Sequence, residues 1–192
     1  MVKIKKMILN LAKSLIIKFK IIVKKYFLIY FKIMFTKATE ANFTFVYNMY
    51  MHPVVNPHLL YEQMSEAEFK PIYTKLLEDD VLYIFINNNE PAGMFKLIPL
   101  THRAAHTAYL GGFAIHPIQA GLGLGLIMLN EIISHIKDNN FKRIELTAGV
   151  QNKKAITLYK KAGFMEEGIL KNCTYFKSED RYIDEVMMSY II

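Results

Sequence analysis

A chain of 192 residues is long enough for one domain with a sizeable hydrophobic core. Its single cysteine, Cys173, excludes an internal disulfide and a cysteine-based zinc site, which fits a reducing, cytoplasmic compartment. The formal net charge of +7 is unevenly spread, because residues 1–33 hold nine of the 24 basic residues and none of the 17 acidic ones. Residues 34–192 therefore carry 15 basic against 17 acidic residues, which argues against a nucleic-acid partner.

Residues 1–33 differ in composition from the rest and predict a basic amphipathic helix. Apolar residues recur every three or four positions from Ile4 to Ile33, and the lysines fall on the remaining arc. The lysines also interrupt the apolar stretches too often for a membrane-spanning helix. Two interpretations stay open: an extension that contacts an anionic membrane surface peripherally, or a functional protein that begins at Met34. In both, we expect residues 34–192 to form the folded domain and residues 1–33 to be dispensable for its activity.

Strands and helices are predicted from residue 34 onward. Ser65 and Glu68 have the spacing of a capping box, which marks the start of a helix. Two adjacent glycines, Gly111 and Gly112, lie inside one predicted strand and indicate a bulge. In chain order we expect a strand at 35–38, a helix that ends near 51, a loop at 52–60, a helix at 66–77, strands at 81–86, 92–98 and 107–115, a helix at 123–137, a strand at 142–147, a helix at 153–162, and a hairpin of strands at 164–175 and 182–190.

Three glycines at alternate positions, Gly121, Gly123 and Gly125, separate the strand at 107–115 from the long helix. Glycines let the backbone turn and approach a ligand, and the free N–H groups at a helix start favour an anion such as a phosphate chain. The run does not complete the dinucleotide fingerprint, and no lysine or hydroxyl residue follows it as in a nucleotide P-loop. Two alternatives remain: a phosphorylated cofactor at this turn, or packing of the helix against the sheet.

The segment at 116–125, H-P-x-x-x-G-x-G-x-G, resembles the acyl-CoA-binding motif of the GNAT superfamily of N-acetyltransferases. Further along, N-K-K-A-I-T-L-Y-K-K-A-G-F at 152–164 resembles the companion motif of that family, with its Asn, its Ala and apolar residue, its Leu-Tyr and its Gly-Phe in order. The resemblance covers residues 34–192. The tail from Arg143 looks most like the branch that acetylates amino acids, protein N-termini or similar small amines.

The resemblance implies an α/β fold with a mixed, mostly antiparallel sheet of about seven strands and helices on both faces. In this family two central parallel strands splay apart and acetyl-CoA, the co-substrate, enters the gap. The family usually has Arg or Gln where Ala120 stands, so we expect backbone N–H groups to hold the pyrophosphate. The positions that the resemblance assigns to the cofactor are Phe113, Ile115, Ala120, Gly121, Leu122, Gly123, Leu124, Gly125, Asn152 and Tyr159.

Two residues of the companion motif have expected roles in the chemistry. By the resemblance, Tyr159 lies beside the thioester sulfur and is the general acid that protonates the leaving thiolate. A phenol with a pKa of about 10 can protonate a thiolate whose conjugate acid has a pKa of about 8.5, although the transfer is mildly uphill. A tyrosine packed in the core is the alternative. Asn152 is expected to cap the helix at 153–162 and also to bind the cofactor arm.

The general base is not identified by the sequence. Many relatives carry a glutamate on the strand before the glycines, and this strand has no acid there. His106, Tyr109, His116 and Glu145 stay open as candidates that act through water. His102 and His106 have a spacing that a metal could use, but they lack an acidic partner, so no metal site is expected.

The acceptor amine is expected between the loop at 51–61 and the C-terminal hairpin. Candidate contacts to its ammonium or carboxylate are His52, His58, Tyr61, Tyr109, Asp184 and Glu185. The predicted function is N-acetylation of a primary amine, either an amino acid, a small amine or a protein N-terminus, by a monomer or homodimer. The alternative is an acyl-CoA-binding module with little or no catalysis, associated with a membrane through its N-terminal helix.

Overall fold

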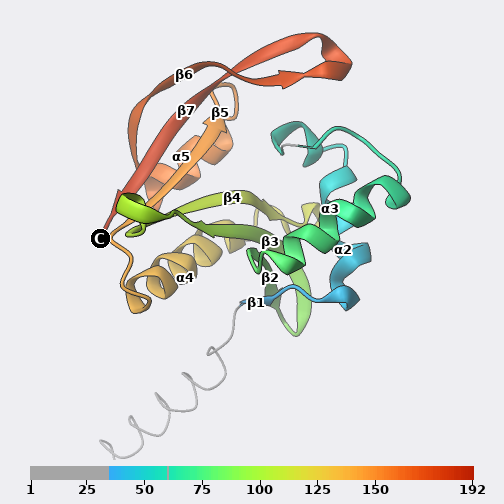
Figure 1. The fold of residues 1–192 in the computed structure, drawn as a ribbon, viewed down its shortest axis with the longest axis horizontal. Coiled ribbons are helices and arrows are strands. Elements are labelled where there is room, and N and C mark those ends of the chain that lie inside the picture. The colour runs from blue at the N-terminus through green and yellow to red at the C-terminus, as the bar shows by residue number, and fades with distance from the viewer. Residues whose placement is uncertain (1–34, 60) are drawn as a thin grey trace, which may run out of the picture. The chain divides into compact units, whose positions relative to one another are not determined.

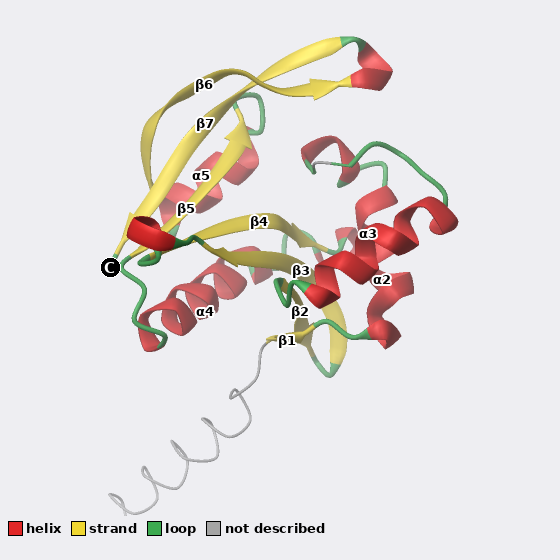
Figure 2. Cartoon of the chain, viewed as in Figure 1, coloured by secondary structure: helices red, strands yellow, loops and turns green. Residues whose placement is uncertain are grey.

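The computed structural model describes residues 35–59 and 61–192, in which seven strands form one sheet. The strand order is β1-β2-β3-β4-β5-β7-β6, and helices cover both faces (Figures 1 and 2). Each predicted helix and strand is present, with ends within two residues of those expected. The bounds are β1 Phe35–Lys37, α2 Phe43–Met51, α3 Glu66–Glu78, β2 Leu82–Asn87, β3 Glu90–Pro99, β4 Thr107–Ile115, α4 Leu124–Asp138, β5 Arg143–Gly149, α5 Lys153–Lys161, β6 Met165–Phe176 and β7 Arg181–Ile191.

Neighbouring strands are antiparallel except for β4 and β5, which run parallel. This confirms the predicted mixed, mostly antiparallel sheet. The β4–β5 pairing covers only Thr107–Tyr109 against Arg143–Glu145. Both strands continue beyond the last pair, β4 to Ile115 and β5 to Gly149, so the sheet opens between them.

The predicted bulge in β4 lies at Gly112. The register between β3 and β4 shifts between Met94 and Lys96, where β4 has one residue more than β3. Gly112 has a φ of +57°, and a Cβ there would lie only 2.8 Å from the Tyr50 hydroxyl oxygen. Glycine is required at this position for both its backbone conformation and its lack of a side chain.

Helices α2 and α3 bury an aromatic cluster against one face of the sheet. Phe69 and Tyr73 of α3 are fully buried and contact the rings of Phe43 and Tyr50 from α2. The Tyr73 hydroxyl donates a hydrogen bond to the Thr39 carbonyl oxygen at 2.6 Å, so its polar end is satisfied. This cluster fixes α2, whose last turn reaches the opening in the sheet.

The start of α3 confirms the predicted capping box. The Ser65 side chain accepts a hydrogen bond from the Glu68 backbone N–H at 3.3 Å, and the Glu68 carboxylate accepts one from the Ser65 N–H at 2.8 Å. Two of the N–H groups that a helix start leaves unpaired are thereby satisfied. Hydrogen bonds to the ionised form also lower the pKa of Glu68.

Helices α4 and α5 lie on the other face of the sheet (Figure 1). The buried side of α4 carries Met128, Leu129 and Ile132, which are inaccessible to solvent. Met128 reaches the sheet at Gly93, where an added Cβ would lie 3.4 Å from its sulfur. In the first turn of α4, a Cβ added to Gly125 would lie 3.9 Å from the side chain of Ile115 at the end of β4, so the helix begins beside the opening in the sheet.

Residues 1–34 and Leu60 lie outside the described residues. The predicted basic amphipathic helix at 1–33, its membrane contact and the start of the domain at residue 34 therefore stay predictions. Within residues 35–59 and 61–192, no helix is long and apolar enough to cross a membrane.

Candidate functional site

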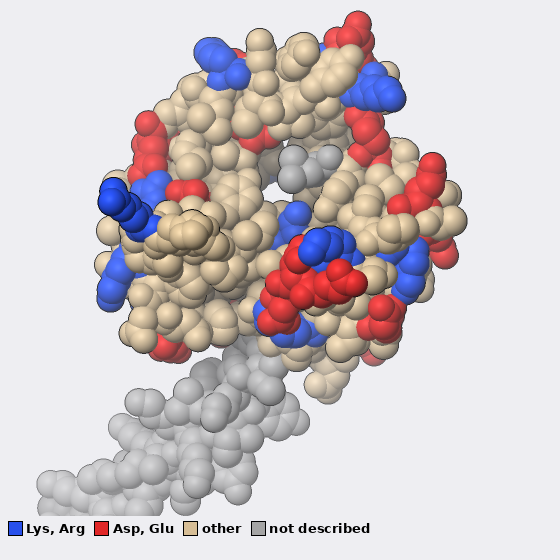
Figure 3. Space-filling model, in the orientation of Figure 1, with Lys and Arg blue, Asp and Glu red and all other residues tan. Residues whose placement is uncertain are grey.

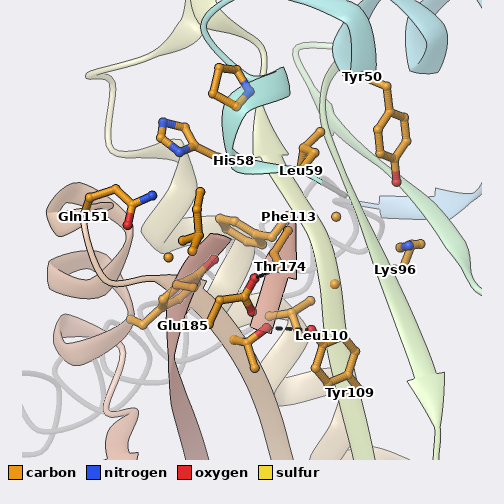
Figure 4. Close-up of a pocket in the computed structure, with 18 of the residues that line it drawn as sticks. Tyr50, His58, Leu59, Lys96, Tyr109, Leu110, Phe113, Gln151, Thr174 and Glu185 are labelled. Atoms are coloured by element: carbon orange, nitrogen blue, oxygen red, sulfur yellow. Dashed lines mark hydrogen bonds between the residues drawn. The ribbon is translucent and has the colours of Figure 1, made fainter. Parts of the chain in front are cut away.

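The opening between β4 and β5 holds a pocket (Figure 4). Its walls come from the bulge of β4, the facing end of β5, the loop before α3, helix α5 and the C-terminal hairpin β6–β7. Figure 3 shows a hollow on this face between the hairpin and the strands below it, with uncharged side chains along most of its rim. Elements distant in the sequence therefore meet at the place where the sheet is unpaired.

The turn before α4 presents a run of free backbone N–H groups. Gly121 and Gly123 have φ angles of +82° and +77°, which L-residues with side chains rarely adopt, and a Cβ at either would meet no atom within 4 Å. These two glycines therefore serve backbone conformation. In the described part of the chain, the N–H groups of residues 121–125 donate no hydrogen bond to another backbone group. They lie at the start of a 15-residue helix, where free N–H groups and the helix dipole favour an anion.

Two neighbours of this turn differ from the expected arrangement. The Ala120 N–H already donates to the Pro117 carbonyl oxygen at 3.1 Å, so it is not a free donor. Gln119, which could have replaced the family's side-chain contact, accepts a hydrogen bond from the Asn87 side chain at 2.9 Å. Leu122 is 67% exposed, and Leu124 is buried. The free donors are therefore those of residues 121–125 alone.

Gly125 has a packing role between two helices. A Cβ at this position would lie 3.0 Å from the side chain of Leu158 in α5. The absence of a side chain at Gly125 lets α4 and α5 approach closely. The first two glycines thus shape the turn, and the third lets one helix pack against the other. A phosphorylated cofactor at this turn stays a prediction.

Tyr159 and Phe113 lie on opposite sides of the opening. The Tyr159 side chain, 6% exposed, lines the pocket from α5, and its ring centroid is 5.9 Å from that of Phe113 in β4. Burial raises the pKa of the Tyr159 phenol well above its usual value, and the nearby Tyr109 adds to this shift. Phe113 and Ile115 both lie past the last β4–β5 pair, so the edge of β4 that faces β5 is unpaired there.

Asn152 is the N-cap of α5, as predicted. Its side-chain oxygen accepts a hydrogen bond from the Ala155 N–H at 3.2 Å. This contact stabilises the first turn of the helix that carries Tyr159. The proposed second role, a contact with the cofactor arm, is not needed to explain the residue.

Of the four candidate bases, only Tyr109 lines the pocket. Its hydroxyl forms a hydrogen bond with the Thr147 hydroxyl at 3.0 Å, and burial raises its pKa. Glu145 is paired with Arg143 at 3.1 Å, and His116 caps a short turn by accepting a hydrogen bond from the Ile118 N–H at 3.3 Å. His106 is exposed in the loop before β4. The structure thus brings no histidine or carboxylate of this set to the pocket.

Three of the six acceptor candidates line the pocket: His58, Tyr109 and Glu185. Burial, followed by the nearby positive charge of Lys154, lowers the pKa of His58. The Glu185 carboxylate accepts a hydrogen bond from the Thr174 hydroxyl. His58 belongs to the loop at 51–61 and Glu185 to the C-terminal hairpin, the two regions expected to hold the acceptor. Tyr109 belongs to β4, between them.

The other three candidates lie elsewhere. The His52 ring accepts a hydrogen bond from the Val54 N–H at 3.1 Å, and Asp184 binds Lys171 at 2.8 Å on the exposed side of the hairpin. Tyr61 lines a small neighbouring hollow, and its ring packs on Tyr50 with a centroid distance of 4.9 Å. Among these three, Tyr61 packs directly on a residue that lines the pocket.

Lys96 and Tyr50 are pocket residues that the sequence analysis missed. Lys96 is 6% exposed on β3, and Tyr50 is 1% exposed at the end of α2. A sequence signal for Lys96 was available, because it stands between apolar residues of a strand, in G-M-F-K-L-I at 93–98. Tyr50 gave no signal, because it belongs to an aromatic helix face that packs in the core. In the part of the chain that the structure describes, no group of three or more metal-binding side chains is present.

The opened sheet, the glycine turn at a helix start and the companion helix define the fold class that the sequence indicated. Residues 38–164 match the acetyltransferase (GNAT) family, and the chain belongs to that family.

Two curated proteins are similar in part. An uncharacterized N-acetyltransferase from Methanocaldococcus jannaschii is 37% identical over 57 residues, which cover 30% of this chain and 25% of that protein. The spermidine N(1)-acetyltransferase of Vibrio cholerae is 28% identical over 116 residues, 57% of this chain and 64% of that protein. The chain therefore spans between a quarter and just under two thirds of these relatives.

Solved structures share the fold over a larger span. The ribosomal-protein-alanine N-acetyltransferase from Brucella melitensis has a TM-score of 0.69 at 19% identity, covering 83% of this chain and all of that one. The spermidine N-acetyltransferase from Vibrio cholerae, in complex with CoA and spermine, has a TM-score of 0.72 at 22% identity, covering 82% and 94%. At these identities the likeness concerns the fold.

Proposed function

We propose that this protein is an acyl-CoA-dependent N-acetyltransferase that moves an acetyl group from acetyl-CoA to a primary amine. The observation that carries the proposal is the opening between β4 and β5, which has five free N–H groups at one end and a buried tyrosine on its wall. The unpaired edge of β4 suits an extended amide chain such as pantetheine. The free N–H groups of residues 121–125 suit the pyrophosphate.

In the proposed reaction the acceptor attacks directly, with both substrates bound. The lone pair of a neutral amine forms a bond to the thioester carbonyl carbon, and the C–S bond breaks. The leaving thiolate takes the Tyr159 proton, and the amine nitrogen loses its proton to solvent. The Tyr159 phenolate then regains a proton from solvent. Tyr109 is the one predicted base candidate that lines the pocket, and its pKa is raised, so we assign proton removal to water rather than to a side chain.

The raised pKa of Tyr159 is compatible with its role as an acid. A higher pKa keeps the phenol protonated, which a proton donor needs, but it makes donation harder. Desolvation also raises the pKa of the leaving thiol, since the thiolate is its charged form. Burial therefore shifts donor and acceptor in the same direction, and the transfer remains close to balanced.

The acceptor is an amine, in keeping with the names of two relatives, which are acetyltransferases of spermidine and of a ribosomal-protein alanine. The described pocket is built from a short loop, two strand ends and a hairpin, which fits a small amine or the end of a peptide.

The test is release of free thiol from acetyl-CoA across a panel of amines, with calorimetric titration of CoA on the same sample. Binding of CoA together with amine-dependent thiol release supports the enzyme. Binding of CoA without release from any amine would favour a cofactor-binding module. A folded sample that binds neither CoA nor acetyl-CoA would contradict both.

A further inference from the structure

Lys96 and Tyr50 come together at the bulge of β4, although they belong to different elements. A Cβ placed on Gly112 would lie 2.8 Å from the Tyr50 hydroxyl oxygen and 3.3 Å from Cε of Lys96. Lys96 is also the register partner of Gly111. Figure 4 shows the two side chains together on one side of the strand that carries Tyr109 and Leu110. The glycine pair thus makes room for two polar ends at the pocket.

Neither polar end has a hydrogen-bond or ion-pair partner within residues 35–59 and 61–192. The Tyr50 hydroxyl is buried without a hydrogen bond, and it is the one side-chain polar atom of this kind in the described part of the chain. There, the Lys96 ammonium makes no hydrogen bond or ion pair; it lies over the face of the Tyr61 ring, 5.6 Å from the ring centroid. Buried polar groups are nearly always paired, and an unpaired buried charge is costly. Burial accordingly lowers the pKa of Lys96.

The chemistry of the two groups defines the missing partner. An ammonium only donates hydrogen bonds, and a phenol beside it can donate one more. The ligand must therefore present an acceptor, and an anion offsets the cost of the buried positive charge. The acyl end of acetyl-CoA carries no charge, and its phosphates are expected at the start of α4. The anionic group therefore belongs to the second substrate.

We propose that the acceptor carries a carboxylate, which Lys96 and Tyr50 bind, so that the substrate is an α-amino acid or a similar small amino acid. This inference rests on the proposed function, because it names the amine of that reaction. In Figure 4, Glu185 and Thr174 lie on the other side of the strand from Lys96 and Tyr50. The pocket therefore has a cationic wall for the carboxylate and an anionic wall that attracts the ammonium before it loses its proton.

The same arrangement disfavours a polyamine. A polyamine would place one positive charge near Glu185, but it has no group that could pair with Lys96. Its additional charges would repel the buried ammonium. The substrate in the complex of the Vibrio cholerae spermidine N-acetyltransferase is therefore not the one that this pocket favours.

The experiment compares kcat/KM for matched pairs of acceptors: a set of α-amino acids and the primary amide of each one. In the wild-type protein the acids are expected to be better acceptors than their amides. Lys96→Met replaces the charged side chain with an uncharged one of similar length. It should lower the ratio of kcat/KM for acids to kcat/KM for amides roughly 10- to 100-fold. Tyr50→Phe removes a hydroxyl and should lower the ratio by about fivefold. Lys75→Met, an exposed lysine of α3 paired with Asp79, is the matched control and should leave the ratio unchanged.

Calorimetric titration of the same acids and amides into the CoA-saturated full chain gives a readout that does not need turnover. If acids bind more strongly than amides, and Lys96→Met loses this difference, the inference is supported. If no amine is acetylated in the same samples, the proposed function is contradicted but the carboxylate contact is not. Acetylation of amides or diamines as efficiently as amino acids overturns the inference and leaves the enzyme in place. An equal fall in kcat for acids and amides in Lys96→Met, with a shifted pH profile, overturns it in favour of a role in proton transfer.

Discussion

The two ends of the opened sheet are built in different ways. The end near α4 relies on backbone groups: two glycines with positive φ and the N–H groups of residues 121–125. The other end relies on side chains, among them Tyr50, Lys96 and Glu185, which come from a helix, a strand and the hairpin. Backbone recognition leaves a compact motif in the sequence because it constrains consecutive residues. Side-chain recognition leaves scattered single residues that only the fold brings together.

The largest effect is expected for a substitution of Tyr159, which lies between the two ends of the opening. Tyr159→Phe removes the proposed proton donor without emptying its space, so kcat should fall about 100-fold or more while the Kd for CoA stays nearly constant. Steady-state kinetics and calorimetry on the same preparation measure both quantities. Tyr83→Phe on β2, a tyrosine that does not line this pocket, is the control. Equal kcat values for Tyr159→Phe and the wild-type protein would remove Tyr159 from the mechanism.

A smaller effect tests the backbone end. Gly123→Ala forces a side chain into a φ of +77°, which costs about 1–2 kcal/mol or shifts the turn. If the turn shifts, the free N–H groups move, and the Kd for CoA should rise by about tenfold, the equivalent of 1.4 kcal/mol. The acid-to-amide preference should not change, because the acceptor end is untouched.

Gly168→Ala in β6 is the matched control for this substitution. It adds a methyl group to open space without a positive φ, so the Kd for CoA should stay at the wild-type value. A normal affinity for CoA in Gly123→Ala would mean that the turn is not the phosphate site.

The sequence predicted the turn before α4 but not the side chains that line the other end of the opening, for physical reasons. Periodicity, capping residues and glycines are local signals, so the elements and the turn at 121–125 could be read directly. The splay between β4 and β5 came from a family resemblance and not from a pattern in either strand. Lys96 was missed because a lone lysine in a strand is usually exposed, and its burial depends on packing from α2 and the bulge. His52 and Asp184 lie in the segments expected to hold the acceptor, but their side chains bind other partners.

The smallest expected effect concerns the hairpin β6–β7, which lines one side of the pocket. Arg143 of β5 donates two hydrogen bonds to the Glu167 carboxylate of β6, at 2.7 and 2.5 Å, and the Ser189 hydroxyl donates a third at 2.6 Å. These contacts lower the pKa of Glu167 from 4.5 to about 2. A lowered pKa in the folded state stabilises the protein above pH 4.5, and this contribution is lost as the pH falls toward 2.

Glu167→Gln should therefore lower the free energy of unfolding at neutral pH by about 1 kcal/mol or less, because the carboxylate is partly exposed to solvent. The dependence of stability on pH between 4.5 and 2 should become less steep. Thermal unfolding over a pH series measures both changes. Glu90→Gln is the control, since Glu90 has no ion pair with another described residue. An unchanged pH dependence in Glu167→Gln would contradict the assignment.

An ordinary open sheet exposes two edges, but this one has four, because β4 and β5 part after Tyr109 and Glu145. The two outer edges, on β1 and β6, can be approached by a strand of any other chain. The two inner ones face each other across the opening that holds the pocket. In the proposed reaction, the extended amide chain of pantetheine pairs with the inner edge of β4. Splitting the sheet internally thus places unpaired backbone groups inside the fold for a small ligand, apart from the outer edges where another protein could pair.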